Sequence, residues 1–193
     1  MIVRLLALFM LFLLIPVFSV VSLLNLIFLG LPIFFTQERV GKNNKSFLLF
    51  KFRTMYLNDN KDVDTKKDNQ RLNSCGKFLR STSLDELPSL INIIKGEMTF
   101  IGPRPLLTEY LELYSQEQLK RHNVLPGITG WAQINGRNSI SWKEKFTKDV
   151  WYVNNKSLYL DLKIILITFK KVILRLDINK NNQITIEKFN GRN

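Results

Sequence analysis

Two adjacent acids near the middle of the chain are the residues best suited to chemistry. Asp85 and Glu86 lie within residues 80–105, which read RSTSLDELPSLINIIKGEMTFIGPRP. A carboxylate can attack a phosphoryl centre when nearby cations spread the negative charge of the phosphate. A second carboxylate beside it can hold Mg²⁺, which neutralises a diphosphate and helps its leaving group depart. The acid pair is therefore compatible with phosphoryl transfer.

Basic residues on both sides of the pair could supply the cations that this chemistry needs. Lys51 and Arg53 precede it, Arg80 lies five positions before Asp85, and Arg104 follows between two prolines. Arginine clamps phosphate oxygens with its forked guanidinium, and flanking prolines stiffen the backbone that presents it. We expect these four cations to gather around the acids.

The local sequence also explains the two acids without any chemistry. Ser83 and Glu86 have the spacing of a capping box, so a helix is expected to begin near Leu84 and to end at Gly96. Asp85 and Glu86 would then stabilise the positive end of the helix dipole. Because N–H groups at a helix start also bind anions, the structural and the catalytic interpretations are compatible.

Composition limits the classes of function. The chain has 193 residues and a net charge of +12, which indicates an anionic partner: a membrane surface, nucleic acid or a phosphorylated substrate. The single cysteine, Cys75, excludes an intramolecular disulfide, and the single histidine, His122, argues against a Ser/His/Asp triad or a His-rich metal site. Any catalysis must depend on carboxylates, Lys, Arg and backbone groups.

The elements that must position these residues begin with an uncharged stretch, residues 5–35. As one helix it would be about 46 Å long, against roughly 30 Å of membrane hydrocarbon. A tilted span, a span with an interfacial segment and a broken helix that returns to the same side all remain open. Pro16 and the basic residues at both flanks favour the broken, re-entrant form, with both ends cytoplasmic.

The rest of the chain alternates short elements. We expect a strand pair or strand–turn over residues 46–55, helices over 106–121 and 142–152, and a short strand over 132–137 that ends in an Asn-Gly turn. Residues 158–176 carry one apolar helical stripe with lysines at its edges. This helix is expected either in the protein core or in the headgroup layer of a membrane.

Two further patterns resemble metal sites but are better explained otherwise. Asp62 and Asp64 form a D-x-D motif like that of metal-dependent glycosyltransferases, yet no apolar strand leads into it. Residues 177–188 are similar to an EF-hand loop, but Asn182 replaces the glycine of the turn and Lys188 the last acidic ligand. A polar loop and a polar tail are the preferred interpretations.

Six motifs together resemble a known family, the monotopic phosphoglycosyl transferases, which start lipid-linked glycan assembly in bacteria. They follow the family's order over nearly the whole chain: QERVG (37–41), KFRTM (51–55), LRSTSLDELPSLINIIKGEM (79–98), IGPRPLL (101–107), LPGITGWAQINGR (125–137) and DVWYVNNKSLYLDLKI (149–164). The tail EKFNGRN (187–193) and WKEKF (142–146) look more like the branch that uses UDP-N,N′-diacetylbacillosamine.

The resemblance implies a small, mostly helical α/β domain bound to the cytoplasmic face of the bacterial inner membrane. It implies a re-entrant membrane helix broken at Pro16 over residues 1–35, a catalytic domain with an amphipathic C-terminal helix over 36–176 and a polar tail over 177–193. Two departures from the family's pattern, Ala7 in place of an acid and Ile15 before the proline, concern only the anchoring of the first helix.

The resemblance also implies a two-step reaction. Asp85 would attack the β-phosphate of a UDP-sugar, release UMP and pass the phosphosugar to undecaprenyl phosphate. Glu86, with Asp85, would bind Mg²⁺; Arg80, Arg104 and the backbone around Gly102 would hold phosphate. Weaker candidates for phosphate or nucleotide contact are Lys51 and Arg137, and His122 is expected to be structural.

Two rival functions remain open. The chain could be a membrane-tethered basic protein that binds anions without catalysis, although it shows no nucleic-acid motif, or a glycosyltransferase that uses Asp62 and Asp64 and releases UDP. Nucleic acid is not an expected partner, whereas membrane lipids and a second copy of the chain are candidate partners. Protein glycosylation and polysaccharide biosynthesis are the processes that the resemblance suggests.

Overall fold

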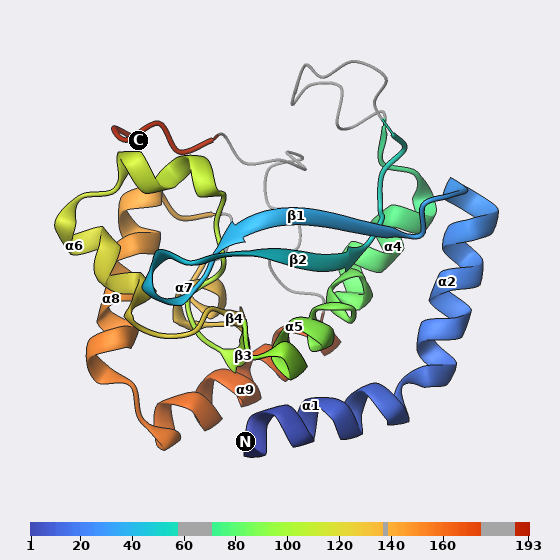
Figure 1. Cartoon of the computed structure of the whole chain (residues 1–193), viewed down its shortest axis with the longest axis horizontal. Helices are drawn as coiled ribbons and strands as arrows, with labels where there is room; N and C mark the ends of the chain where they lie inside the picture. The colour runs from blue at the N-terminus through green and yellow to red at the C-terminus, as the bar shows by residue number, and fades with distance from the viewer. Residues whose placement is uncertain (58–70, 137–138, 175–187) are drawn as a thin grey trace.

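The computed structural model describes residues 1–57, 71–136, 139–174 and 188–193 (Figure 1). Asp62, Asp64, Arg137 and residues 177–187 of the EF-hand-like segment lie outside these ranges, so the predictions made on them are not tested. The described chain is a mixed α/β fold in which helices predominate, as expected from the sequence.

Two apolar helices open the chain, α1 (Ile2–Leu13) and α2 (Ile15–Leu29), and they meet at a 62° bend. Pro16 lies in the first turn of α2, where its missing N–H is tolerated, so the chain breaks where the sequence predicts. Within the described part of the chain, neither helix has the length and apolarity to cross a membrane by itself, whereas the bent pair taken together has both.

The hairpin that follows crosses the middle of the molecule. Strands β1 (Phe34–Val40) and β2 (Ser46–Phe52) pair antiparallel, joined through the 3₁₀ turn η1 (Lys42–Asn44). Residues 46–55, expected to form a strand pair or a strand–turn, contain the single strand β2, and its partner β1 was not anticipated. Its first residues continue the apolar run before it, and because most of the strand is exposed its side chains show little of the in–out alternation that marks a half-buried strand.

Helix α5 (Ser89–Lys95) closes the free edge of β2 with two side chains. The Ser89 hydroxyl donates to the Phe50 carbonyl at 2.9 Å, and the Asn92 amide donates to the Leu48 carbonyl at 2.7 Å. The Phe50 N–H donates back to Asn92 Oδ1 at 3.0 Å. Because Ser89 and Asn92 are buried, these bonds replace a third strand and hold α5 against the hairpin.

The predicted capping box is wrong. Helix α4 (Ser74–Thr82) ends at Ser83, whose backbone is left-handed at φ 57° and whose side chain makes no cap hydrogen bond. A 3₁₀ turn, η2 (Leu84–Glu86), follows, and α5 begins only after Pro88 because a proline inside a continuous helix would break its hydrogen-bond ladder. Gly96 ends α5 in the left-handed conformation, as predicted.

A second, parallel pair of strands brings two loops together. Strands β3 (Thr99–Ile101) and β4 (Gly127–Thr129) were not predicted, and close approach of their flanking backbones depends on glycine. A Cβ on Gly102 would lie 2.4 Å from the Leu125 carbonyl oxygen, and one on Gly130 would lie 2.1 Å from the Gly102 oxygen. This packing fixes the loop that carries Arg104.

The segment 106–121 is less regular than predicted. It forms the 3₁₀ helix η3 (Thr108–Leu113), the short α6 (Gln116–Leu119) and the start of η4 (Lys120–Asn123), because Ser115 caps α6 with a reciprocal Gln118 bond and restarts the helix. The prediction of a strand over 132–137 is also wrong, because a short helix, α7 (Trp131–Ile134), precedes the Asn-Gly turn. Helix α8 (Trp142–Asn155) confirms the prediction for 142–152.

The end of the chain returns to the body of the molecule. Phe189 is buried in an aromatic cluster with Tyr110, Tyr114 and Phe146, and Lys188 lies 3.1 Å from Glu109.

A separate apolar cluster joins α1 and α5 to β2; its buried members are Ala7, Phe47, Leu49, Leu90, Ile93 and Met98. Ala7 is therefore fully buried where α1 packs against α5.

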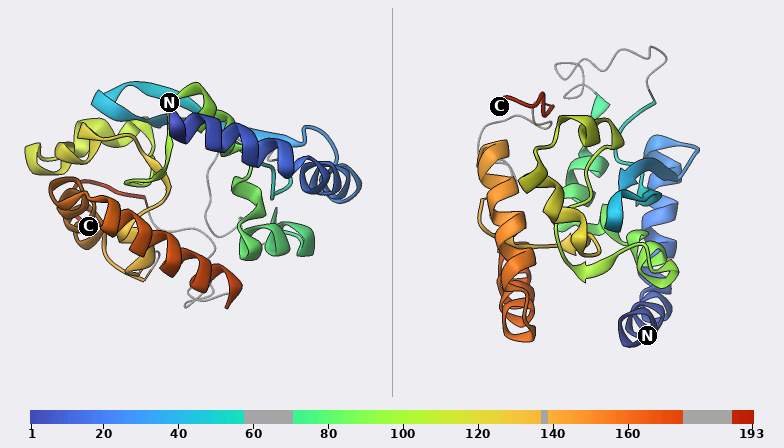
Figure 2. Two further views of the ribbon diagram at one scale, coloured as in Figure 1. Left: turned by 90° about the horizontal axis from the view of Figure 1, so that it is seen from below. Right: turned by 60° about the vertical axis from the view of Figure 1, so that its left-hand side comes forward.

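Helix α9 (Leu158–Ile173) turns its apolar stripe away from the protein. Its inner side buries Leu160 and Ile164, whereas Leu166 is 70% and Phe169 62% exposed. Of the two alternatives, packing in the protein core therefore holds for Leu160 and Ile164 but not for the predicted apolar stripe. Both α9 and α1 lie on the lower side of the molecule in Figure 1, and seen from below they run along opposite edges of it (Figure 2). Helix α1 also exposes apolar side chains, among them Phe9 and Phe12.

Candidate active site

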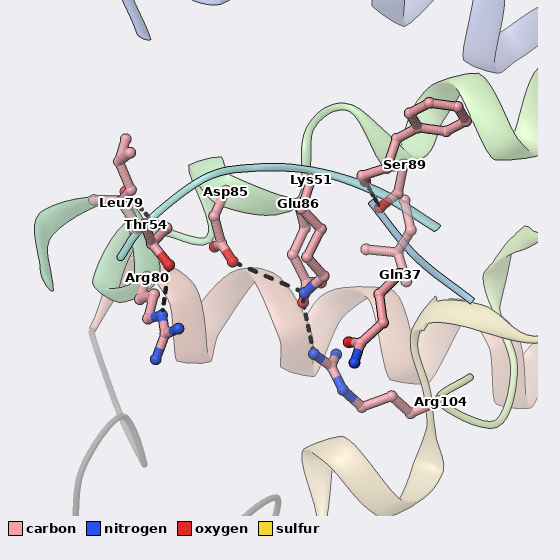
Figure 3. Close-up of polar contacts among 12 residues, drawn as sticks. Gln37, Lys51, Thr54, Leu79, Arg80, Asp85, Glu86, Ser89 and Arg104 are labelled. Atoms are coloured by element: carbon pink, nitrogen blue, oxygen red, sulfur yellow. Dashed lines mark hydrogen bonds and ion pairs between the residues drawn. The ribbon is translucent and has the colours of Figure 1, made fainter. Parts of the chain in front are cut away.

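The acid pair lies in the η2 turn, between the end of α4 and the start of α5. Glu86 forms two ion pairs through the same oxygen, Oε1, at 2.7 Å from Lys51 Nζ and 2.8 Å from Arg104 Nη2 (Figure 3). The Glu86 side chain is only 13% exposed. The structure thus brings together one acid and two of the cations that the sequence suggested.

Asp85 lies beside this cluster, between it and Arg80 (Figure 3). Its Oδ2 is 3.8 Å from Lys51 Nζ, a contact too long for a hydrogen bond but close enough for electrostatic attraction. Arg80 donates from Nε to the Thr54 hydroxyl at 3.0 Å, which orients the guanidinium. Asp85 is therefore the less tightly held of the two carboxylates.

The two acids have opposite pKa shifts. Burial raises the pKa of Asp85, and the positive charge of Lys51 only partly offsets this. Burial acts in the same direction on Glu86, but Arg104 and Lys51 together lower the pKa of that carboxyl far below its usual range. Glu86 is thus a permanent anion that holds two cations, while Asp85 has the more basic carboxylate.

A buried ion pair fixes the backbone of the Arg104 loop. Arg121 donates to the Arg104 carbonyl oxygen at 2.7 Å and to Asp149 Oδ2 at 2.8 Å. The side chains of Arg121 and Asp149 are 1% and 6% exposed. Sequence reasoning did not identify this pair; Asp149 opens one of the six motifs, but nothing in the sequence indicates its contact with Arg121.

Arg53, grouped with the phosphate-binding candidates from the sequence, has another role. It is buried and donates to the carbonyl oxygens of Leu29 and Gly30, each at 2.6 Å. A guanidinium at the C-terminal end of a helix satisfies its free carbonyls and the negative end of its dipole. Arg53 therefore fastens α2 to the hairpin, and the expectation that it joins the other cations is wrong.

The Gly102 backbone has a packing role in this structure. Its N–H donates to the Thr129 carbonyl at 2.9 Å, in line with the β3–β4 ladder.

His122 is buried, as expected of a structural residue. Burial, and then the positive charge of Arg121, lower the pKa of His122 to about 3. The remaining candidate, Arg137, lies outside the described residues.

One cation near the acids was missed. Arg39 of β1 lines a pocket that also contains Lys51, Glu86 and Arg104. A signal was available, because Arg39 belongs to QERVG (37–41), the first of the six motifs that carry the family resemblance.

The acid pair suits Mg²⁺ better than a softer metal. Carboxylate oxygens are the donors that Mg²⁺ prefers, and it is commonly held by one or two carboxylates together with substrate phosphates. Both cations contact Oε1 of Glu86, so the other carboxylate oxygen and the Asp85 carboxylate are donors of the right kind. Among the described residues no group of three His, Cys, Asp or Glu could hold a metal by itself.

Comparison with known proteins places this site in a family. The family model described as bacterial sugar transferase matches residues 1–175. The uncharacterized sugar transferase EpsL of Bacillus subtilis is 50% identical over 163 residues, covering 84% of this chain and 81% of EpsL.

Two relatives have named activities. A UDP-glucose:undecaprenyl-phosphate glucose-1-phosphate transferase of Klebsiella pneumoniae is 44% identical over 72% of this chain, and an undecaprenyl-phosphate galactose phosphotransferase of Salmonella typhimurium is 37% identical over 77%. The chain spans about a third of the length of each, 32% and 34%.

Proposed function

The chain belongs to the bacterial sugar transferase family, and we propose that it transfers a phosphosugar from a UDP-sugar to undecaprenyl phosphate with release of UMP. The observation that carries the proposal is the position of Asp85, between Arg80 on one side and the Lys51–Glu86–Arg104 cluster on the other (Figure 3). The names of the Klebsiella and Salmonella relatives, which act on undecaprenyl phosphate, support the same reaction class.

The first step in this proposal is attack by a carboxylate oxygen of Asp85 on the β-phosphorus of the UDP-sugar. The bond from that phosphorus to the bridging oxygen breaks, UMP leaves with the electron pair, and the phosphosugar stays on Asp85. A largely buried carboxylate with a raised pKa is a better nucleophile than one held in a tight ion pair. Arg80 and Lys51 would spread the negative charge that develops on the phosphoryl oxygens.

In the second step an oxygen of undecaprenyl phosphate attacks the same phosphorus and releases the Asp85 carboxylate. The product is undecaprenyl diphosphate-sugar, and the enzyme returns to its starting state. Glu86 and Asp85 would hold Mg²⁺, which supplies charge neutralisation to the diphosphate when bound. Glu86 also keeps Lys51 and Arg104 in place through its two ion pairs.

A membrane location suits a lipid substrate. We propose that residues 1–35 form a re-entrant membrane anchor, that residues 36–176 are catalytic and face the cytoplasm, and that the enzyme resides at the bacterial inner membrane. The exposed apolar sides of α1 and α9, which lie on the same side of the molecule, support this arrangement (Figure 1).

For the sugar we propose UDP-N,N′-diacetylbacillosamine or a related N-acetyl amino sugar, as the first membrane step of glycoprotein or polysaccharide assembly. The support is the tail EKFNGRN and the motif WKEKF, which resemble that branch of the phosphoglycosyl transferases. The named relatives use glucose or galactose, so these sugars are the natural competitors in any test.

Nucleotide release tests the proposal directly. Purified protein would receive Mg²⁺, undecaprenyl phosphate and, in turn, UDP-N,N′-diacetylbacillosamine, UDP-N-acetylglucosamine, UDP-glucose or UDP-galactose. We expect UMP from the amino sugar. Asp85→Asn, which preserves shape but cannot act as a nucleophile, should reduce release by at least about 1,000-fold.

Other outcomes contradict the proposal in different ways. Release of UDP would indicate a glycosyltransferase mechanism. Lack of any nucleotide release, with anionic vesicles still bound by wild type and by Asp85→Asn alike, would favour a tethered anion-binding protein. UMP release from glucose or galactose alone would keep the reaction and overturn the sugar.

A further inference from the structure

A positively charged pocket lies beside the acid pair, and its lining includes Arg39, Lys51, Glu86, Arg104, Pro105 and Ile128. Asp85 is not among the lining residues, so the pocket adjoins the attacking carboxylate instead of containing it. We propose that Arg39 and Arg104 together bind the α-phosphate of the UDP-sugar, the phosphate that leaves with UMP. This inference rests on the proposed function.

The hairpin places Arg39 on the side of the site. In the register of β1 and β2, Arg39 is opposite Phe47, Gln37 opposite Leu49 and Phe35 opposite Lys51. Directly opposed residues of an antiparallel pair share one face, so Arg39, Gln37 and Lys51 face the same side of the hairpin. Phe47 and Leu49 on that face pack against the cluster that includes α5, so the rigid part of the core orients the strand.

Local bonds aim the Arg39 guanidinium. Its Nη2 donates to Gln37 Oε1 at 2.6 Å, and its Nη1 lies 3.5 Å from the Pro105 carbonyl oxygen. The Arg39 Nε is buried and has no hydrogen-bond partner among the described residues. A buried donor without a partner is unfavourable, which indicates that a further acceptor belongs there.

The charge of the pocket is unbalanced. Three cations line it: Arg39, Lys51 and Arg104. The single acid in the lining, Glu86, already forms ion pairs with Lys51 and Arg104. Arg39 forms no ion pair with an acid in the described ranges. Burial, and then repulsion from Arg104, lowers the pKa of Arg39 to about 10, so it still carries its charge at neutral pH. An anion between the two arginines would relieve this repulsion.

Reaction geometry decides which anion fits. The phosphorus under attack must lie next to Asp85, which assigns the β-phosphate to the Asp85–Arg80 side. The bridging oxygen puts the α-phosphorus two bonds away from the β-phosphorus, in the adjoining pocket. Forked guanidinium groups suit phosphate oxygens, and a cation there would also favour departure of UMP by stabilising its developing charge.

Steady-state kinetics of Arg39→Gln and Arg39→Lys would test the assignment. Arg39→Gln should raise the KM for the UDP-sugar about 10- to 100-fold, the loss expected for a charge-assisted hydrogen bond. Arg39→Lys keeps the charge but not the fork, so its effect should be smaller. The KM for undecaprenyl phosphate should stay within about twofold in both variants. Lys42→Gln, which removes an exposed charge from the same hairpin, is the control and should behave as wild type.

A binding measurement separates this inference from the reaction itself. By calorimetry, UMP should bind wild type more tightly than uridine does, and Arg39→Gln should weaken UMP binding about tenfold or more without changing uridine binding. Unchanged KM and UMP affinity in folded variants would overturn the role of Arg39 even if wild type releases UMP. A rise in the KM for undecaprenyl phosphate alone, or an equal rise in both, would overturn it too. Failure of wild type to release UMP would instead refute the proposed function.

Discussion

Glu86 holds two cations that come from distant parts of the chain. Lys51 lies on the hairpin and Arg104 on the loop after β3, and both contact the same carboxylate oxygen. Carboxylate–cation contacts of this kind are stronger than neutral hydrogen bonds, and breaking them leaves the partners partly desolvated and unpaired. At the scale of single residues, Glu86 therefore holds the cluster together, and Asp85 makes only the longer 3.8 Å contact with Lys51.

Glu86→Gln should impair both stability and catalysis. The amide keeps the size of the side chain but loses its charge, so we expect a loss of about 1–3 kcal/mol in unfolding free energy and at least 100-fold slower UMP release. Urea unfolding and the nucleotide assay measure the two effects. Glu117→Gln, in the exposed pair with Lys120, is the control and should change stability by less than about 0.5 kcal/mol. Equal effects of the two substitutions would contradict this role of Glu86.

His122 should make the fold sensitive to acid. Its pKa falls from 6.5 to about 3 on folding. As the pH drops below 6.5, the unfolded chain binds a proton that the folded chain does not, so stability is present above the unfolded pKa and is lost on acidification. Between pH 7 and pH 5 we expect this residue to lower the unfolding free energy by about 2 kcal/mol.

The comparison of wild type with His122→Gln isolates that contribution. Urea titrations at several pH values should give a shallower pH dependence for the variant, whatever its absolute stability. Parallel curves for the two proteins would show that His122 titrates alike in both states.

At the scale of elements, the helix that follows the acid pair is locked onto the strand that carries Lys51. Ser89 and Asn92 bond the outer edge of β2, and neither side chain could do so if α5 were turned or shifted by a residue. The distance between Lys51 and the acids is thus set by hydrogen bonds between side chains of α5 and the backbone of β2. The same logic applies to Arg121, which holds the Arg104 backbone from η4.

Asn92→Ala should therefore destabilise the protein and slow its release of UMP. The change leaves the Phe50 N–H and the Leu48 carbonyl without partners in a buried place, for which we expect a loss of about 2–4 kcal/mol. Asn155→Ala removes an exposed bond at the end of α8 and is the matched control, with an expected change below about 0.5 kcal/mol. Unfolding by urea compares the two, and similar losses would contradict a special role of the β2 edge.

At the scale of the whole molecule, two helices with exposed apolar side chains, α1 and α9, lie on the same side. α1 and α9 come from opposite ends of the described chain, yet both run along the lower side in Figure 1. Neither can bury its outer stripe within the protein, since Leu166 and Phe169 of α9 and Phe9 and Phe12 of α1 are more than half exposed. A surface of this kind is suited to a lipid interface.

Charged substitutions on that side should weaken membrane binding without unfolding the protein. Leu166→Glu and Phe169→Glu remove apolar burial of about 1.5–3 kcal/mol each, so vesicle binding should fall at least tenfold for each. Leu48→Glu, an exposed position on the hairpin, is the control and should bind as wild type. Flotation with vesicles containing anionic lipid measures the effect, and an equal loss in all three variants would exclude α9 as the contact surface.

Local chemistry made several features readable from the sequence. The break at Pro16, the end of α5 at Gly96 and the helices α8 and α9 follow from proline, glycine and apolar spacing, which act within a few residues. The family resemblance follows from six motifs in order. The prediction was wrong where local signals conflicted. The sequence around Ser83 predicts the start of a helix, but Ser83 ends α4, and the next helix begins only after Pro88.

Only the tertiary structure decided which cations belong to the acids. Arg53 and Lys51 are two positions apart, yet the first binds the end of α2 and the second binds Glu86. Arg39, Arg104 and Arg121 acquire their roles from β1, the loop after β3 and η4, which meet through long-range packing. Charge type is a property of the sequence, whereas the partner of a charge depends on distance and burial, and those exist only once the chain has folded.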